Sequence, residues 1–186
     1  MSRRTALPER SEIESDFSVR LLVYEYHQDD PRKCTSARLR RFGLARQLPS
    51  IKRIPRSSIV LNPRGELRIS KRDRSQLETY GLVGLDCSWN QSEDIFLERF
   101  PGEARRLPAL LAGNPTNYGV LSKLSTAEAF AGALYITGFE AQAGRVLSLF
   151  KWGQTFLTLN KEPLEAYAEA QPEQLAEVES EFFNVN

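Results

Sequence analysis

Three short segments with polar residues follow three apolar segments of this chain, and each could help to bind a small ligand. They are Lys33-Cys34-Thr35, Leu61-Asn62-Pro63 and Asp86-Cys87-Ser88-Trp89. Where parallel strands alternate with helices, ligands bind at the carboxyl ends of the strands. We therefore expect these three groups to converge on one binding site.

A fourth polar segment, residues 113–119, has the sequence GNPTNYG and indicates a turn-rich loop. Gly and Asn tolerate positive φ, and Pro fixes φ near −65°. Ser125 and Glu128 have the spacing of a capping box, which predicts a helix start. The residues of the helix that follows are small and apolar on nearly every face, so this helix should be buried. A loop leading into such a helix suits a small polar ligand. We interpret Asn114 and Asn117 as loop-shaping, with direct ligand contact as the alternative.

The elements that must position these groups can be outlined from hydrophobic patterning. Apolar segments at 19–24, 58–61 and 81–86 predict three buried strands, and Thr35 or Ser36 could cap a short helix. Residues 73–80 indicate a short helix or a linker. Helical spacing follows at 104–112, 125–139, 141–150 and 163–170. We predict a loose tail over 1–16, an α/β domain over 17–100, a helical domain over 101–172 and an acidic tail over 173–186.

The composition is that of an ordinary globular protein, with 41% hydrophobic and 26% charged residues and a formal net charge of +1. Two cysteines and one histidine lack the spacing of a metal site, so we expect no metal. The first 16 residues lack the apolar segment of a signal peptide, and no apolar run approaches the roughly 20 residues of a membrane span. We therefore expect a cytoplasmic protein with reduced thiols and no membrane association.

Charge is unevenly distributed along the chain. Residues 32–74 are rich in Lys and Arg, whereas every charged residue from Glu162 onward is glutamate. This asymmetry suggests a basic surface in the first half, and a merely solvated helix face is the alternative.

Six segments of the chain carry a family resemblance. They are DDPRKCTSARL at 29–39, IVLNP at 59–63, GLVGLDCSWN at 81–90, RRLPALLAGNPTNYG at 105–119, KLSTAEAFAGALYITGF at 123–139 and LFKWGQTFLTLN at 149–160. In this order and spacing, they resemble the small-subunit ribosomal RNA aminocarboxypropyltransferases. The resemblance implies a SPOUT-like α/β part with a parallel sheet and a deep trefoil knot, followed by an all-helical C-terminal part.

The resemblance also implies an activity. Enzymes of this family transfer the 3-amino-3-carboxypropyl group of S-adenosylmethionine to N3 of a uridine-type base, typically N1-methylpseudouridine, in small-subunit rRNA, and methylthioadenosine leaves. The expected partner is this rRNA or a pre-ribosomal particle, and the protein should act as a monomer. A SPOUT-type RNA methyltransferase and a non-catalytic rRNA-binding assembly factor are the alternatives. The by-product separates the two enzymes, because a methyltransferase releases S-adenosylhomocysteine.

Site residues follow by position from the same resemblance. Asp86 is the candidate catalytic residue, which would accept the N3 proton or orient the base, and capping of the next turn is its structural alternative. Thr35 would bind the carboxylate of the methionine portion, although it could be only a helix cap. Trp89 would form an aromatic wall beside the sulfonium, and simple core packing is the alternative.

The adenine of S-adenosylmethionine should be held by backbone groups in an apolar slot. By resemblance, the contacting positions are Leu85, Leu107, Ser122 and Thr126, with Leu61 and Pro63 nearby. Relatives commonly carry an aromatic residue where this chain has Ser122. Its absence would remove a stacking surface, for which Leu121 could compensate.

The RNA would be bound by basic side chains through salt-dependent phosphate contacts, with a loop base flipped into the cleft. The candidates are Arg32, Lys33, Arg38, Arg40, Arg41, Arg46, Lys52, Arg53, Arg56, Arg64, Arg68, Lys71, Arg72 and Arg74. We interpret Phe150 and Trp152 as helix packing, with base stacking as the alternative.

Overall fold

A five-stranded parallel sheet forms the centre of the N-terminal part of the protein. The computed structural model describes residues 18–26, 34–89 and 92–183, so the predicted tail over 1–16 lies outside the described residues. The strand order is β2-β1-β4-β3-β5. The strands are β1 (Leu21–Glu25), β2 (Arg46–Gln47), β3 (Ile59–Leu61), β4 (Leu82–Asp86) and β5 (Glu103–Arg105), and every pairing is parallel. The three strands expected from the sequence are confirmed as β1, β3 and β4.

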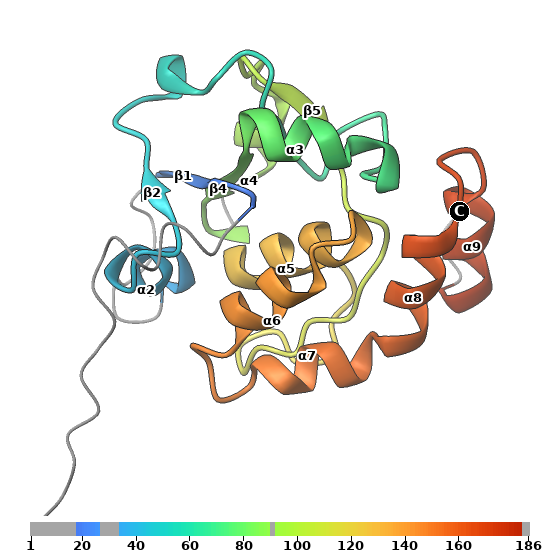
Figure 1. Cartoon of the computed structure of the whole chain (residues 1–186). Coiled ribbons are helices and arrows are strands. Elements are labelled where there is room, and N and C mark those ends of the chain that lie inside the picture. The colour runs from blue at the N-terminus through green and yellow to red at the C-terminus, as the bar shows by residue number, and fades with distance from the viewer. Residues whose placement is uncertain (1–17, 27–33, 90–91, 184–186) are drawn as a thin grey trace, which may run out of the picture.

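Helices surround the sheet and form most of the C-terminal part (Figure 1). Beside the sheet strands lie α2 (Thr35–Arg41), α3 (Arg74–Tyr80), α4 (Ser92–Leu97) and two 3-10 turns at Ile51–Arg53 and Lys71–Asp73. The later helices are α5 (Thr126–Ile136), α6 (Glu140–Leu147), α7 (Gly153–Leu159), α8 (Lys161–Glu169) and α9 (Leu175–Phe182). The capping box of Ser125 and Glu128 is confirmed at the start of α5. None of the helices that the structure describes is long and apolar enough to span a membrane.

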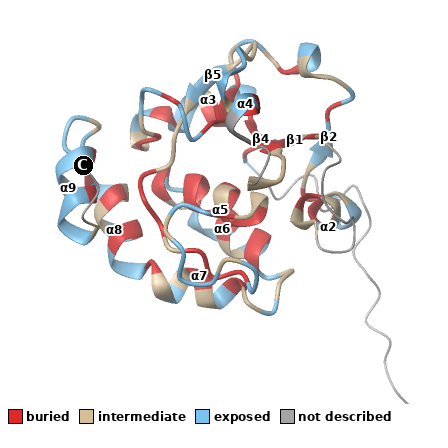
Figure 2. Cartoon of the chain, turned by 180° about the vertical axis from the view of Figure 1, so that it is seen from behind, coloured by how far each residue is buried: buried red, intermediate tan, exposed pale blue. Residues whose placement is uncertain are grey.

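Side chains of the strands alternate between two hydrophobic clusters. Leu21 and Val23 belong to the larger cluster, which contains the buried residues of α5, whereas Leu22 and Val60 belong to a smaller one on the other face. This alternation follows from the two-residue period of a strand. Figure 2 shows β1, β4 and much of α5 as buried. A Cβ at Gly84 of β4 would lie 2.9 Å from the Phe130 ring, so glycine lets α5 approach the sheet closely.

The predicted helix over 104–112 is wrong. Residues Glu103–Arg105 form β5, which pairs with β3, and residues 107–110 have no regular structure. Pro108 disfavours a helix because it has no N–H and restricts the residue before it. The apolar spacing that indicated a helix instead belongs to an extended segment buried between the sheet and the later helices.

Buried side chains from the helices satisfy the backbone of this extended segment. Glu179 of α9 accepts from the Ala109 N–H, and Tyr167 of α8 donates to the Ala109 carbonyl. Asn160, which precedes α8, bonds both the N–H and the carbonyl of Leu111 at 2.7 and 2.8 Å. Because a buried backbone group without a partner is costly, these side chains take the place of a neighbouring strand.

The acidic C-terminal segment contains a docked helix. Leu175 of α9 is fully buried in the larger cluster, and Glu179 pairs with Arg68 across 111 residues of sequence. Arg72 pairs with Glu173 in the same region. The larger cluster also contains residues from both sides of residue 100. The division into domains stays a prediction.

Replacing Asn160 should destabilise the protein strongly. Asn160→Ala leaves the N–H and carbonyl of Leu111 without their partner and removes a third bond, from the Asn160 amide to the Phe156 carbonyl. We expect the free energy of unfolding to fall by about 3 kcal/mol. Urea denaturation would measure it, with exposed Gln154→Ala on α7 as the control. A decrease below about 1 kcal/mol would show that the extended segment does not depend on Asn160.

Candidate functional site

A cavity of about 610 Å³ lies at the carboxyl ends of β3 and β4. All seven side chains selected from the sequence line it, namely Thr35, Leu85, Asp86, Trp89, Leu107, Ser122 and Thr126. The three polar groups that follow the strands also meet there, through Cys34 and Thr35, through Leu61, Asn62 and Pro63, and through Asp86 to Trp89. The structure therefore brings together the residues that topology and resemblance indicated.

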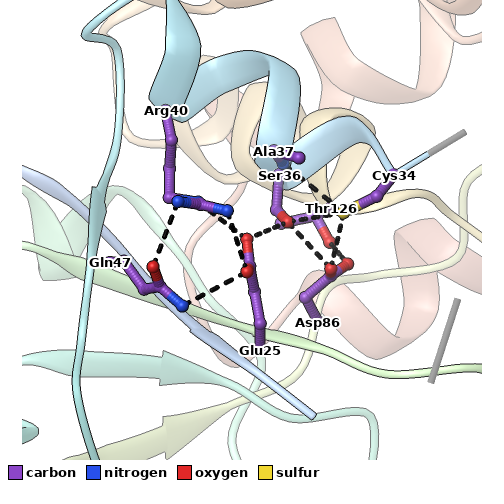
Figure 3. Close-up of polar contacts among 8 residues, drawn as sticks. All are labelled: Glu25, Cys34, Ser36, Ala37, Arg40, Gln47, Asp86 and Thr126. Atoms are coloured by element: carbon purple, nitrogen blue, oxygen red, sulfur yellow. Dashed lines mark hydrogen bonds and ion pairs between the residues drawn. The ribbon is translucent and has the colours of Figure 1, made fainter. Parts of the chain in front are cut away.

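Asp86 ends β4, and three side chains hold its carboxylate (Figure 3). Thr126 donates to Oδ1 at 2.7 Å. Ser36 donates to Oδ2 at 2.8 Å, and the Cys34 thiol donates to the same oxygen at 2.9 Å. Among the described residues, these partners of the Asp86 carboxylate are all side chains, and none is a backbone N–H of the turn that follows. The carboxylate is instead clamped between the first turns of α2 and α5.

Two members of this cluster, Glu25 and Ser36, were not selected from the sequence. Glu25 is the last residue of β1 and is buried, and Arg40 of α2 holds it through bonds of 2.8 and 3.0 Å. The Gln47 amide also donates to Glu25. Ser36 is fully buried and lies 2.7 Å from Glu25 Oε1. The strand-end rule could have found Glu25, because β1 and β4 end at the same edge.

Cys34 is the N-cap of α2, a position that we expected Thr35 or Ser36 to occupy. Its sulfur accepts from the Ala37 N–H. Burial and the hydrogen bond to Asp86 raise the pKa of the Cys34 thiol to about 11, and the smaller effects of Ser36 and Ala37 oppose that rise. Cys34 is therefore a neutral thiol at pH 7, and it acts as a hydrogen-bond donor to Asp86.

Thr35 and Trp89 both border the cavity, and each is anchored by a hydrogen bond to the backbone near α5. The Thr35 hydroxyl accepts from the Ala127 N–H at 3.3 Å, which joins the start of α2 to the start of α5. The Trp89 indole donates to the Leu124 carbonyl at 3.0 Å, and its ring lies 5.9 Å from the Phe96 ring. Trp89 is half-buried and borders the cavity, so it is not a simple core residue.

The remaining wall is built from the extended segment and the loop after it. Glu128 of α5 accepts from the N–H groups of Gly113 and Asn114 and from the Asn114 amide. Asn114 Oδ1 accepts from the N–H groups of residues 116 and 117, which confirms Asn114 as loop-shaping. Ser122 has φ 59°, a left-handed conformation that is uncommon for a residue other than glycine.

Many of the basic residues assigned to RNA have partners within the chain. Arg40 pairs with Glu25, Arg68 with Glu179 and Arg72 with Glu173. Lys71 donates to the Glu169 carbonyl, and Arg74 donates to two carbonyls after α5 and lies over the Phe139 ring. Arg32 and Lys33 lie outside the described residues. The basic and acidic halves of the sequence therefore partly neutralise one another.

Two protein-family models match this chain. A family model described as ribosome biogenesis protein, C-terminal, matches residues 59–183. A second model, described as a possible Fer4-like domain in RNase L inhibitor, matches residues 19–53. Iron–sulfur clusters are held mainly by about four cysteine thiolates, and these residues contain only Cys34. Ligand atoms of Glu25, Cys34 and Asp86 do lie within 4.8 Å of one another. Hydrogen bonds account for that proximity, because Cys34 donates directly to Asp86 and Ser36 lies between the two carboxylates.

Named relatives and a solved structure agree with the first model. The 16S rRNA aminocarboxypropyltransferase of Methanosarcina acetivorans is 46% identical, over 88% of this chain and 94% of the relative. The enzyme of the same name from Thermoplasma acidophilum is also 46% identical, over 87% and 100%. The structure of the SAM-dependent rRNA:acp-transferase Tsr3 from Vulcanisaeta distributa matches with a TM-score of 0.84 and 42% identity, over 91% of each chain. This chain belongs to the 16S rRNA aminocarboxypropyltransferase family.

Proposed function

We propose that this protein transfers the 3-amino-3-carboxypropyl group of S-adenosylmethionine to N3 of an N1-methylpseudouridine, pseudouridine or uridine in small-subunit rRNA. 5′-Methylthioadenosine is the other product. The observation that carries this proposal is the clamped Asp86 carboxylate at the cavity of a chain 46% identical to enzymes with that name. The reaction would belong to ribosome biogenesis, as the description of the matching family model indicates.

The cavity suits S-adenosylmethionine in size and chemistry. Its volume of about 610 Å³ lies in the usual range for small-molecule sites. Leu85, Leu107 and the neighbouring backbone offer an apolar slot for adenine. The Trp89 ring offers an aromatic face to a sulfonium. S-adenosylmethionine supplies the electrophilic carbon, and the protein selects which carbon reacts by positioning it against the base.

We assign the proton transfer to Asp86. A uracil-type N3 must lose its proton to attack carbon, and Asp86 is half-buried at the wall of the cavity. Three donors fix the orientation of its carboxylate, which favours proton transfer along one direction. The N3 electron pair then forms the new N–C bond, and the electrons of the broken C–S bond leave with methylthioadenosine.

A second contact with rRNA is proposed at the opposite edge of the sheet. Lys52 and Arg56 precede β3, Arg99 precedes β5, and together with Ile54, Phe100 and Pro101 they line a shallow hollow of about 480 Å³. Within the described ranges, these three cations have no ion-pair partner, unlike Arg68 and Arg72. They are therefore available to phosphate groups.

The product test comes first. The protein is incubated with labelled S-adenosylmethionine and small-subunit particles from cells that lack the enzyme, and mass spectrometry identifies the small products. Methylthioadenosine with a matching mass gain on the RNA supports the proposal. S-adenosylhomocysteine with a methyl gain would replace it by a SPOUT-type methyltransferase. RNA binding without any turnover would favour an assembly factor.

Asp86→Asn should separate catalysis from cofactor binding. The amide keeps the shape of the side chain but cannot take the proton, so we expect kcat to fall by about 10²- to 10⁴-fold. The Kd for S-adenosylmethionine, measured by calorimetry, should change only a few-fold. Asp94→Asn, at an exposed position of α4, is the matched control. Normal kcat in Asp86→Asn would remove Asp86 from the mechanism.

Removing positive charges from the hollow should weaken RNA binding without changing the residues that line the cavity. For Lys52→Ala combined with Arg56→Ala, we expect the slope of log K against log salt to become shallower by about 2, because each removed cation no longer neutralises a phosphate. Fluorescence anisotropy with the rRNA fragment would measure the slope. Arg145→Ala with Lys161→Ala, on exposed faces of α6 and α8, removes the same charge as a control. Equal slopes for both variants would contradict RNA binding at the hollow.

We also propose that the backbone contains the deep trefoil knot that the family resemblance implies. Two observations support it. Strand β4 lies between β1 and β3, both of which precede it in sequence. The backbone at Arg106 bonds with Leu67 and Ile69, and a Cβ at Gly65 would lie 2.8 Å from the Arg106 nitrogen, so the later segment runs tightly against the earlier loop.

Single-molecule stretching from both ends of the chain would test the knot. A knotted chain should reach a shorter final extension than an unknotted chain of 186 residues, because the tightened knot retains some length. A full extension would disprove the knot without affecting the proposed activity.

A further inference from the structure

The parallel register brings two carboxylates together at the edge of the cavity. Glu25 of β1 is the direct partner of Asp86 of β4. Like charges on directly paired residues repel each other. One hydroxyl lies between them, because Ser36 Oγ is 2.7 Å from Glu25 Oε1 and 2.8 Å from Asp86 Oδ2 (Figure 3).

Ser36 has only one hydrogen for these two acceptors. The Cys34 sulfur also lies 2.8 Å from Ser36 Oγ, and either atom could be the donor in that contact. The Ser36 hydrogen can therefore go to only one of its neighbours at a time, and it cannot serve both carboxylates fully. Arg40 donates to both oxygens of Glu25, so that carboxylate is compensated by a guanidinium. Asp86 has no such cation among the residues that the structure describes, and it depends on the neutral donors Ser36, Cys34 and Thr126.

The hydrogen bonds of Asp86 leave one direction for a further donor. A carboxylate has about four acceptor sites, two on each oxygen. Ser36 and Cys34 occupy both sites on Oδ2, and Thr126 occupies one on Oδ1. The remaining site is on Oδ1, and Asp86 borders the cavity. A base that donates its N3–H to Asp86 would therefore meet Oδ1.

We propose that Ser36 is a positioning residue that donates to Asp86 while Asp86 is ionised and turns to Glu25 once Asp86 has taken the N3 proton. The inference rests on the proposed function. In the step, the N3–H bond breaks and its proton goes to Asp86 Oδ1, the N3 electron pair forms the N–C bond, and the C–S electron pair leaves with methylthioadenosine. Only the hydroxyl hydrogen has to turn, because Ser36 Oγ already lies within bonding distance of both carboxylates.

Ser36→Ala tests the proposal in the full-length protein. Ser36 is fully buried, so water cannot readily replace its hydroxyl. We expect kcat for aminocarboxypropyl transfer to fall by about tenfold, the order expected for one hydrogen bond to a charged group. The Kd for S-adenosylmethionine should change less than about twofold, because Ser36 does not line the cavity. Single-turnover kinetics and calorimetry give the two values.

Two further variants separate positioning from a general packing defect. Ser58 is also fully buried, donates to the Pro55 carbonyl and precedes β3 at the other edge of the sheet, so Ser58→Ala is the matched control and should keep normal kcat. Ser36→Thr retains the hydroxyl and should recover most of the rate. If Ser36→Thr does not fold, the test rests on Ser36→Ala alone, in which kcat should fall while the Kd for S-adenosylmethionine stays nearly unchanged.

The outcomes are distinct. A selective decrease of kcat in Ser36→Ala supports the proposal. Unchanged kcat, a parallel decrease of kcat and cofactor affinity, or a folded Ser36→Thr that stays as slow as Ser36→Ala would overturn it. The wild-type protein is assayed alongside, and if it transfers no aminocarboxypropyl group, the proposed function fails instead.

Discussion

Satisfying the backbone of residues 107–114 is the constraint on which the rest of the structure depends. This segment walls the cavity, yet it belongs to no helix and to no regular strand pair. Its buried N–H and carbonyl groups would be costly without partners. Glu128, Asn160, Tyr167 and Glu179 supply those partners from four places in the helical part. The later helices are therefore needed to shape the site as well as to fill the core.

The unequal charge distribution has a structural role within the fold. Buried Glu179 bonds both Arg68 and the Ala109 N–H, so a single carboxylate links α9, the loop before α3 and the cavity wall. Arg72 and Lys71 strengthen the same contact at the surface, through Glu173 and the Glu169 carbonyl. Exposed pairs of this kind contribute little individually. The buried pair matters more, because removing one member would leave the other charged and unpaired.

Sequence reasoning succeeded where a local signal determined the structure. Apolar segments identified β1, β3 and β4, the capping box identified the start of α5, and strand ends located Asp86 in the cavity. It failed where contacts between residues far apart in the sequence determine the local structure. The apolar spacing of 104–112 fits a helix, and only β3 and the buried side chains around the segment make it extended.

The strand-end rule could place Glu25 near the site, but its pairing with Asp86 and the role of Ser36 show the same limit. Glu25 appears in sequence as an ordinary acidic residue after an apolar run, and Ser36 as a possible cap. Their importance follows from the register of β1 on β4, which pairs Glu25 with Asp86, and from the docking of α2 against α5. Register between strands separated by some 60 residues is a property of the whole fold, and no local pattern fixes it.

The bond from Glu179 to Ala109 has a consequence for the timing of folding. The sheet strands lie within residues 21–105, but the wall of the cavity is complete only when a residue 70 positions after Ala109 has docked. Contacts between such distant residues require loop closure and tend to form more slowly than local ones. During synthesis, the chain can assemble its sheet long before it can enclose a ligand. The wall of the cavity is therefore completed only after α9 has been synthesised and has docked.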